Sequence, residues 1–193
     1  MSVVKNGRLL VLLDANETLM YRQYDPAKSK YGPPVVRPFL KEFFAKLSSE
    51  PKVDVGVWCG AMTMAQEAAI LEILASGGVP TDSLKVVLRA FDVCQRKGAG
   101  RYFPGTTKLI YVKPVGLVNM LLPAYPRVLL VDNDPEKSDG VGPAGKRRWK
   151  NLPDEHMEVP PFRGQFMDNC LNPDGGASWV ALHKRVSALR QLL

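Results

Sequence analysis

Three short, mostly apolar runs limit what this chain can fold into. They cover residues 8–13, 53–58 and 127–131 and read RLLVLL, VDVGVW and RVLLV. Runs of this length without regular polar alternation are typical of strands that are buried on both faces of a parallel sheet. Two of the runs stop directly on an aspartate, at Asp14 and Asp132. The sequence therefore predicts a covered parallel sheet with carboxylates at its strand ends.

The segments around these runs have helical patterns, with apolar residues at helical spacing and glycine or proline at the boundaries. The expected helices cover residues 36–47, 63–76, 115–122 and 179–193, and further strands cover residues 84–88 and 108–112. Residues 18–34 and the basic, Gly- and Pro-containing stretch at about 136–150 are expected to be loops. Alternating strands and helices predict an α/β fold with a central, mostly parallel sheet flanked by helices.

Length and composition fit one globular domain over residues 1–193, with 46% hydrophobic and 23% charged residues. No apolar run approaches the roughly 20 residues of a membrane-spanning helix, so no membrane span is expected. Cys59, Cys94 and Cys170 lack the spacing of a zinc site or a disulfide scaffold. An intracellular, reducing compartment is the expectation, with nucleus, cytoplasm and mitochondrion left open.

The net charge of +7 favours acidic partners, such as nucleic acid, a phosphorylated peptide or an anionic membrane surface. The most basic run contains Lys146, Arg147, Arg148, Trp149 and Lys150. Two interpretations stay open for it. The run is either a solvated surface loop or an RNA-binding segment in which the tryptophan stacks on a base.

The strand-end carboxylates suggest phosphoryl-transfer chemistry. Asp14 could act as a nucleophile that forms an acyl-phosphate. Such a carboxylate needs a divalent cation beside a phosphate ester, and Mg²⁺ prefers hard oxygen ligands. The second polar cluster, Asp132, Asn133 and Asp134, supplies further oxygens. Lys113, at the end of the intervening apolar run, could neutralise charge on the transferring group.

Five stretches in order resemble the haloacid dehalogenase superfamily, and specifically the C-terminal-domain phosphatases of RNA polymerase II with their small-phosphatase and Dullard-like relatives. LLDANETL is similar to the motif Asp-x-Asp-x-Thr-Leu. The others are VRPFLKEFF, VGVWCGA, YVKP and VLLVDNDP. The resemblance covers nearly the whole chain and implies a Rossmann-like fold of the haloacid dehalogenase type.

The resemblance also implies a role for each matching residue. Asp14 matches the nucleophile, and Asn16 matches the general acid/base position, whose backbone carbonyl binds Mg²⁺ in the family. Thr18 matches the threonine of the first motif, and Cys59 matches a position whose hydroxyl contacts the phosphate. Lys113 matches the lysine that orients the phosphate, while Asp132 and Asn133 match the final motif, in which the second residue binds the metal. The chain departs from the pattern at three positions: Asn16 replaces an acid, Cys59 replaces a hydroxyl residue, and Pro114 replaces the acid after the lysine.

An amide cannot supply the proton transfer that typically contributes about 10²–10⁴ in rate. We therefore favour a catalytically impaired member of this fold that serves as a binding or scaffold subunit for a protein partner, with an RNA-containing assembly as one setting. The alternative is a Mg²⁺-dependent phosphoserine or phosphothreonine phosphatase that acts through an aspartyl-phosphate on Asp14.

Overall fold

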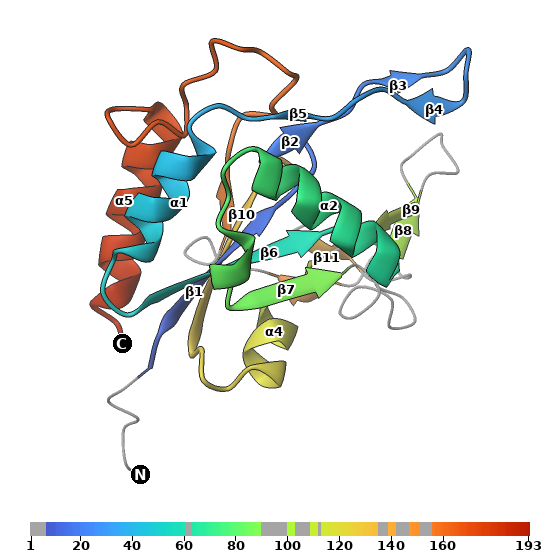
Figure 1. Cartoon of the computed structure of the whole chain (residues 1–193). Coiled ribbons are helices and arrows are strands. Elements are labelled where there is room, and N and C mark those ends of the chain that lie inside the picture. Colours follow the sequence, from blue (N-terminus) through green and yellow to red (C-terminus); the bar gives the residue numbers. More distant parts are fainter. Residues whose placement is uncertain are drawn as a thin grey trace.

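The computed structural model describes residues 7–60, 63–89, 100–102, 109–111, 113–134, 139–141, 147–150 and 156–193. Within these residues, a five-stranded parallel sheet forms the centre, in the order β13-β10-β1-β6-β7 (Figure 1). Its strands are β1 (Leu9–Asp14), β6 (Val53–Cys59), β7 (Val86–Arg89), β10 (Arg127–Asp132) and β13 (His156–Glu158). The predicted α/β fold with a central parallel sheet is confirmed.

The register of the central strands brings Asp14 and Asp132 to the same end of the sheet, where the strands have their carboxyl ends. β1 pairs with β6 on one side and β10 on the other, so that Leu13 lies opposite both Val57 and Val131. One residue further, Asp14 and Asp132 end their strands. In parallel sheets the carboxyl ends of the strands are where ligands gather.

Among the described residues, four helices cover the two faces of this sheet (Figure 1). They are α1 (Leu40–Ser48), α2 (Met64–Ser76), α4 (Val115–Leu121) and α5 (Ala177–Arg190). The odd-numbered apolar residues of β1 pack in a core cluster with α1, α2 and α5. Leu10 and Leu12 pack on the opposite face with Trp58 and α4. Burial on both faces explains why the β1 run shows no polar alternation.

Helix α1 begins four residues later than expected. Val36 belongs to the short strand β5 (Val35–Val36), and Arg37 N donates a hydrogen bond to Leu19 O at 2.8 Å, so the chain is still extended there. Phe39 then adopts a left-handed conformation, with φ 66°, directly before the helix. Apolar spacing therefore predicted the buried face of the helix correctly but not its first residue.

The segment that was expected to be a loop, residues 18–34, contains several strands. β2 (Met20–Tyr21) pairs with β5, and β3 (Tyr24–Asp25) pairs with β4 (Lys30–Tyr31) in a hairpin. Two-residue strands are too short to show a hydrophobic period, which is why the sequence pattern missed them.

Two further antiparallel pairs lie outside the central sheet. β8 (Gly100–Tyr102) pairs with β9 (Leu109–Tyr111), and β11 (Asp139–Val141) pairs with β12 (Arg147–Lys150). The basic stretch therefore includes a strand pair where a loop was predicted. A short 3₁₀ helix, η1 (Thr81–Ser83), precedes β7. In the part of the chain that the structure describes, no helix combines the length and apolar character that crossing a membrane requires.

Candidate active site

The predicted lysine lies between the two strand-end aspartates. Lys113 Nζ donates hydrogen bonds to Asp14 Oδ1 and, at 2.8 Å, to Asp132 Oδ2. The three residues are 4%, 2% and 0% exposed, respectively. Pro114 is the N-cap of α4, so Lys113 lies one residue before the cap of the helix that packs on the Leu10 and Leu12 face of the sheet. The packing of α4 thus delivers the ammonium group to the carboxyl ends of β1 and β10.

The two carboxylates determine the charge state of the lysine between them. Burial lowers the pKa of Lys113, but the charges of Asp132 and Asp14 outweigh this effect and hold the pKa above its ordinary value. The lysine is therefore charged at neutral pH.

Thr18 and Asn133 extend the cluster. Thr18 Oγ1 lies 3.4 Å from Asp14 Oδ2 and 3.1 Å from Asn133 Oδ1, and it accepts a hydrogen bond from Asn133 N at 3.2 Å. A hydroxyl has one proton, so it can donate to only one of the two oxygens at a time. Asp134 N donates to Asp132 Oδ1 at 2.9 Å, which orients the second carboxylate. Polar groups from two strand ends therefore form one connected network.

Asn16, which stands at the expected general-acid position, lies at the rim of this network. The residue is exposed, and its backbone forms an isolated bridge with Met20. A Cβ atom on Gly60 would lie 3.4 Å from Asn16 Nδ2, so the amide is next to the chain that leaves β6. The side chain is thus close to the end of a second strand and accessible to solvent.

Cys59 lies in the hydrophobic core at the end of β6. Its side chain is fully buried within the core cluster that faces α1, α2 and α5, and Sγ donates to Leu88 O at 3.5 Å. This environment matches that of a small buried hydrophobic residue. The structure therefore brings together Asp14, Lys113, Asp132 and Asn133, with Asn16 at the rim, and places Cys59 in the core.

Arg37 is an important residue to which the sequence analysis assigned no role. It is 2% exposed and donates hydrogen bonds to Thr18 O at 2.9 Å and Pro160 O at 3.0 Å. It also bonds both carboxylate oxygens of Asp168, at 3.2 and 2.9 Å, and contacts Cys170 Sγ. Arg37 thereby fixes the loop after β1 to the C-terminal segment. Its only signal in the sequence was its place in VRPFLKEFF.

The basic stretch is described only in part. Lys146 lies outside the described residues, whereas Arg147, Arg148, Trp149 and Lys150 form β12, whose backbone lies next to α4. Nucleic-acid binding by these residues stays a prediction.

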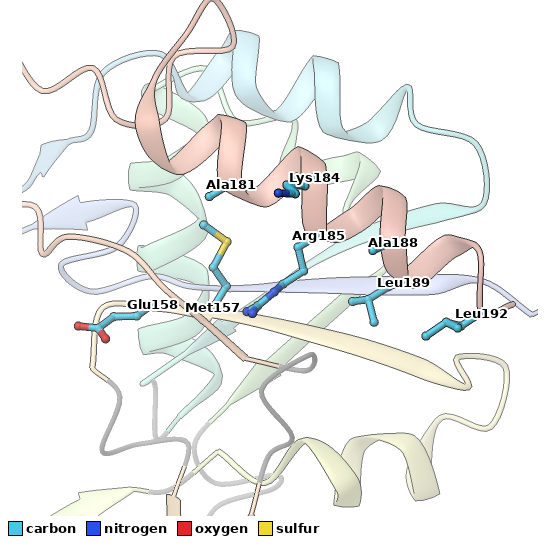
Figure 2. Close-up of a pocket in the computed structure, with 8 residues that line it drawn as sticks. All are labelled: Met157, Glu158, Ala181, Lys184, Arg185, Ala188, Leu189 and Leu192. Carbon is cyan, nitrogen blue, oxygen red and sulfur yellow. The ribbon is translucent and has the colours of Figure 1, made fainter.

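A separate pocket of about 670 Å³ lies at the edge of the sheet, between β13 and α5 (Figure 2). Its lining residues are Met157, Glu158, Ala181, Lys184, Arg185, Ala188, Leu189 and Leu192. Arg185 Nη1 donates to His156 O and so ties the helix to the edge strand. None of the residues at the carboxyl ends of β1 and β10 lines this pocket.

Among the described residues, no group of three or more His, Cys, Asp or Glu side chains could hold a metal ion. The oxygens that could take part in a mixed site are those of Asp14, Asn133 and the Asn16 backbone. In comparisons with known proteins, no family model and no curated protein matches the chain. The structure shows a Rossmann-like α/β domain with a central five-stranded parallel sheet.

Proposed function

We propose that the chain is a catalytically impaired phosphatase of the haloacid dehalogenase type that binds a phosphorylated protein segment at the ends of β1 and β10. The observation that carries the proposal is the position of Lys113 between Asp14 and Asp132. A buried carboxylate beside a charged lysine, with a second carboxylate on the next strand, is an arrangement suited to accepting a phosphoryl group.

The donor set fits Mg²⁺ in its chemistry. Asp14 Oδ2 and Asn133 Oδ1 both lie within hydrogen-bond distance of the Thr18 hydroxyl, at 3.4 and 3.1 Å, so a carboxylate and an amide oxygen converge. Mg²⁺ takes one or two carboxylates and keeps several waters, so it needs no larger acidic cluster. Asp14, Asn133 and the Asn16 carbonyl would hold the ion, which would offset the repulsion between carboxylate and phosphate.

The proposed reaction begins with attack of Asp14 on the phosphorus of a phosphoserine or phosphothreonine. A bond forms between the carboxylate oxygen and phosphorus, and the ester bond breaks, releasing the serine or threonine oxygen as an alkoxide that needs a proton. Lys113 neutralises charge on the phosphoryl group. Asn16 cannot donate that proton, nor take one from the water that later hydrolyses the aspartyl-phosphate. Binding is therefore retained while turnover is slow.

The test of the catalytic part uses an aryl phosphate with Mg²⁺, because its good leaving group needs little acid assistance. We expect slow turnover that is lost in Asp14→Ala and is retained in Glu72→Gln, a matched exposed carboxylate on α2. Asn16→Asp should raise turnover by about 10²–10⁴, the usual contribution of general acid/base catalysis. Absence of turnover in both the unmodified protein and Asn16→Asp would refute an assembled phosphatase site.

The test of the binding part compares a phosphoserine peptide with its unphosphorylated form. Lys113→Met removes the charge that faces the phosphate, so the preference for the phosphorylated peptide should disappear. Equal binding of both peptides by the unmodified protein would contradict the proposal.

A second candidate function is a subunit of an RNA-containing assembly, favoured by the charge of +7 and by the basic residues of β12. Its test is the association of the tagged protein with RNA or large particles at moderate salt. A protein that stays free of both would exclude this function.

A further inference from the structure

We infer that Glu17 is a positioning residue, which fixes the side-chain amide of Asn133 so that its oxygen faces the Asp14 site. The inference rests on the proposed function in one respect, because the oriented oxygen matters only if the site binds a cation. The orientation itself can be measured without any ligand.

Each oxygen of the Glu17 carboxylate has its own partner. Oε2 accepts a hydrogen bond from Asn133 Nδ2 at 3.3 Å, and Oε1 accepts one from Arg163 Nη1. The Arg163 guanidinium in turn lies 5.8 Å from the centre of the Tyr21 ring. The arginine therefore occupies one carboxylate oxygen and leaves the other directed at Asn133.

The backbone at Glu17 is held in an uncommon conformation. Its φ is 60°, a left-handed value that costs free energy for a residue with a side chain. Two backbone hydrogen bonds maintain it: Glu17 N donates to Met20 O, and Phe162 N donates to Glu17 O, both at 2.6 Å. Strain of this kind persists where surrounding contacts fix it, and it concentrates at functional sites.

The hydrogen bonds of Asn133 determine which way its amide points. Nδ2 donates to Glu17, and on the opposite side Oδ1 lies 3.1 Å from the Thr18 hydroxyl that also contacts Asp14. If the amide turned over, Oδ1 would face the Glu17 carboxylate, and two acceptors would repel each other. The NH₂ group would then face the Asp14 site and could not bind a cation. Glu17 thus excludes the orientation that would disable Asn133.

An ordinary exposed ion pair is the competing explanation for Glu17 and Arg163, whose side chains are 33% and 51% exposed. Pairs of this kind contribute little to stability and have no effect on a neighbouring site. The two explanations differ in what they predict for Asn133, so substitutions can separate them.

The first measurement is the affinity for Mn²⁺, used as a probe for Mg²⁺ and followed by the EPR signal of the free ion. Residues that orient a metal ligand typically contribute about 10–100-fold to metal affinity, so Glu17→Ala should weaken binding about tenfold. Glu17→Gln keeps an acceptor for Asn133 Nδ2 and should restore most of the affinity. Unchanged affinity in Glu17→Ala would overturn the inference.

The matched control repeats the Mn²⁺ measurement in a protein that carries Asn133→Asp. In Asn133→Asp the two oxygens are equivalent, so no partner is needed to choose which atom faces the cation. Glu17→Ala should therefore weaken Mn²⁺ binding in the original protein but not in the Asn133→Asp background. Equal weakening in both backgrounds would show that Glu17 acts through its charge alone, and the inference would fail.

The third measurement needs no metal. In the ¹⁵N-resolved NMR spectrum, the side-chain NH₂ signals of Asn133, identified by their loss in Asn133→Asp, should show one hydrogen-bonded, slowly exchanging proton. Glu17→Ala should abolish this protection and Glu17→Gln should keep it. If the unmodified protein binds no Mn²⁺, the proposed metal site is wrong, while the NMR result still decides the orientation. A lack of protection in the unmodified protein would overturn the inference.

Discussion

Arg37 and Lys113 are both buried cations, but they are neutralised in different ways. Arg37 faces a single carboxylate, that of Asp168, and its other hydrogen bonds go to the backbone oxygens of Thr18 and Pro160 and to Cys170 Sγ. Lys113 instead faces two carboxylates, those of Asp14 and Asp132. In the first arrangement one cation meets one carboxylate, whereas in the second one cation lies between the carboxylates of two strand ends.

We relate this difference to two roles, a structural ion pair at Arg37 and the proposed ligand site at Lys113. A buried cation that is fully paired and hydrogen-bonded holds segments together, and removal of either partner is costly. Two buried carboxylates that share one cation repel each other, and functional sites commonly hold such unfavourable arrangements at a cost in stability. We expect Arg37 to be needed for folding and the aspartates around Lys113 to be needed for binding.

Replacement of Arg37 should have the largest effect on stability. Arg37→Met removes the cation that pairs with Asp168, which still accepts a hydrogen bond from Cys170 N, and breaking a largely buried pair in this way costs roughly 3–5 kcal/mol of unfolding free energy. Urea denaturation followed by circular dichroism measures the loss. Lys28→Met is the control, because Lys28 pairs with Asp25 at the surface and its side chain is 66% exposed. It should leave the urea midpoint essentially unchanged.

The result that would contradict this prediction is a small loss. A cost below about 1 kcal/mol for Arg37→Met would place Arg37 among surface ion pairs. Arg37 would then not be a structural cation, and the contrast with Lys113 would not hold.

Two isosteric substitutions should have opposite effects on stability. Asp168→Asn removes the charge that faces Arg37 and should cost about 1–3 kcal/mol. Asp14→Asn removes the repulsion between the Asp14 and Asp132 carboxylates while its amide oxygen can still accept from Lys113, so stability should be unchanged or higher. Thermal and urea unfolding of both variants check this pair of outcomes. Equal destabilisation would mean that the strand-end cluster is also a structural ion pair.

The sequence predicted the strand-end site because its parts have local signals. Continuous apolar runs that stop on Asp14 and Asp132 imply neighbouring strand ends, and motif order pointed to Lys113. The same reasoning gave the apolar face of α1 and the extent of α2, α4 and α5 to within a few residues. Periodicity is a reliable signal where an element is long and faces a core.

The remaining features depend on contacts between distant segments. Arg37 and Asp168 are 131 positions apart, and nothing in either segment indicates that they meet. β13 has only three residues and depends on pairing with β10 for its conformation. Glu17 lies within the recognised motif, yet its contact with Arg163 arises only when the C-terminal segment returns to β1.

The smallest expected effect is on the pH dependence of the unfolding free energy, to which the two cations contribute in opposite pH ranges. Burial raises the pKa of Asp168, but hydrogen bonds from Arg37 and the Cys170 backbone outweigh this and hold the pKa below its ordinary value of 3.8. A lowered carboxyl pKa contributes stability above the unfolded value, and this contribution is lost as pH falls through the folded value. Lys113 has a raised pKa, so its contribution is complete below its ordinary value of 10.5 and is lost only as pH rises further.

Unfolding free energies measured across the acid range should therefore fall less steeply with decreasing pH in Asp168→Asn than in the unmodified protein. Parallel curves would show that Asp168 does not change its pKa on folding, and the charge balance inferred at Arg37 would be wrong.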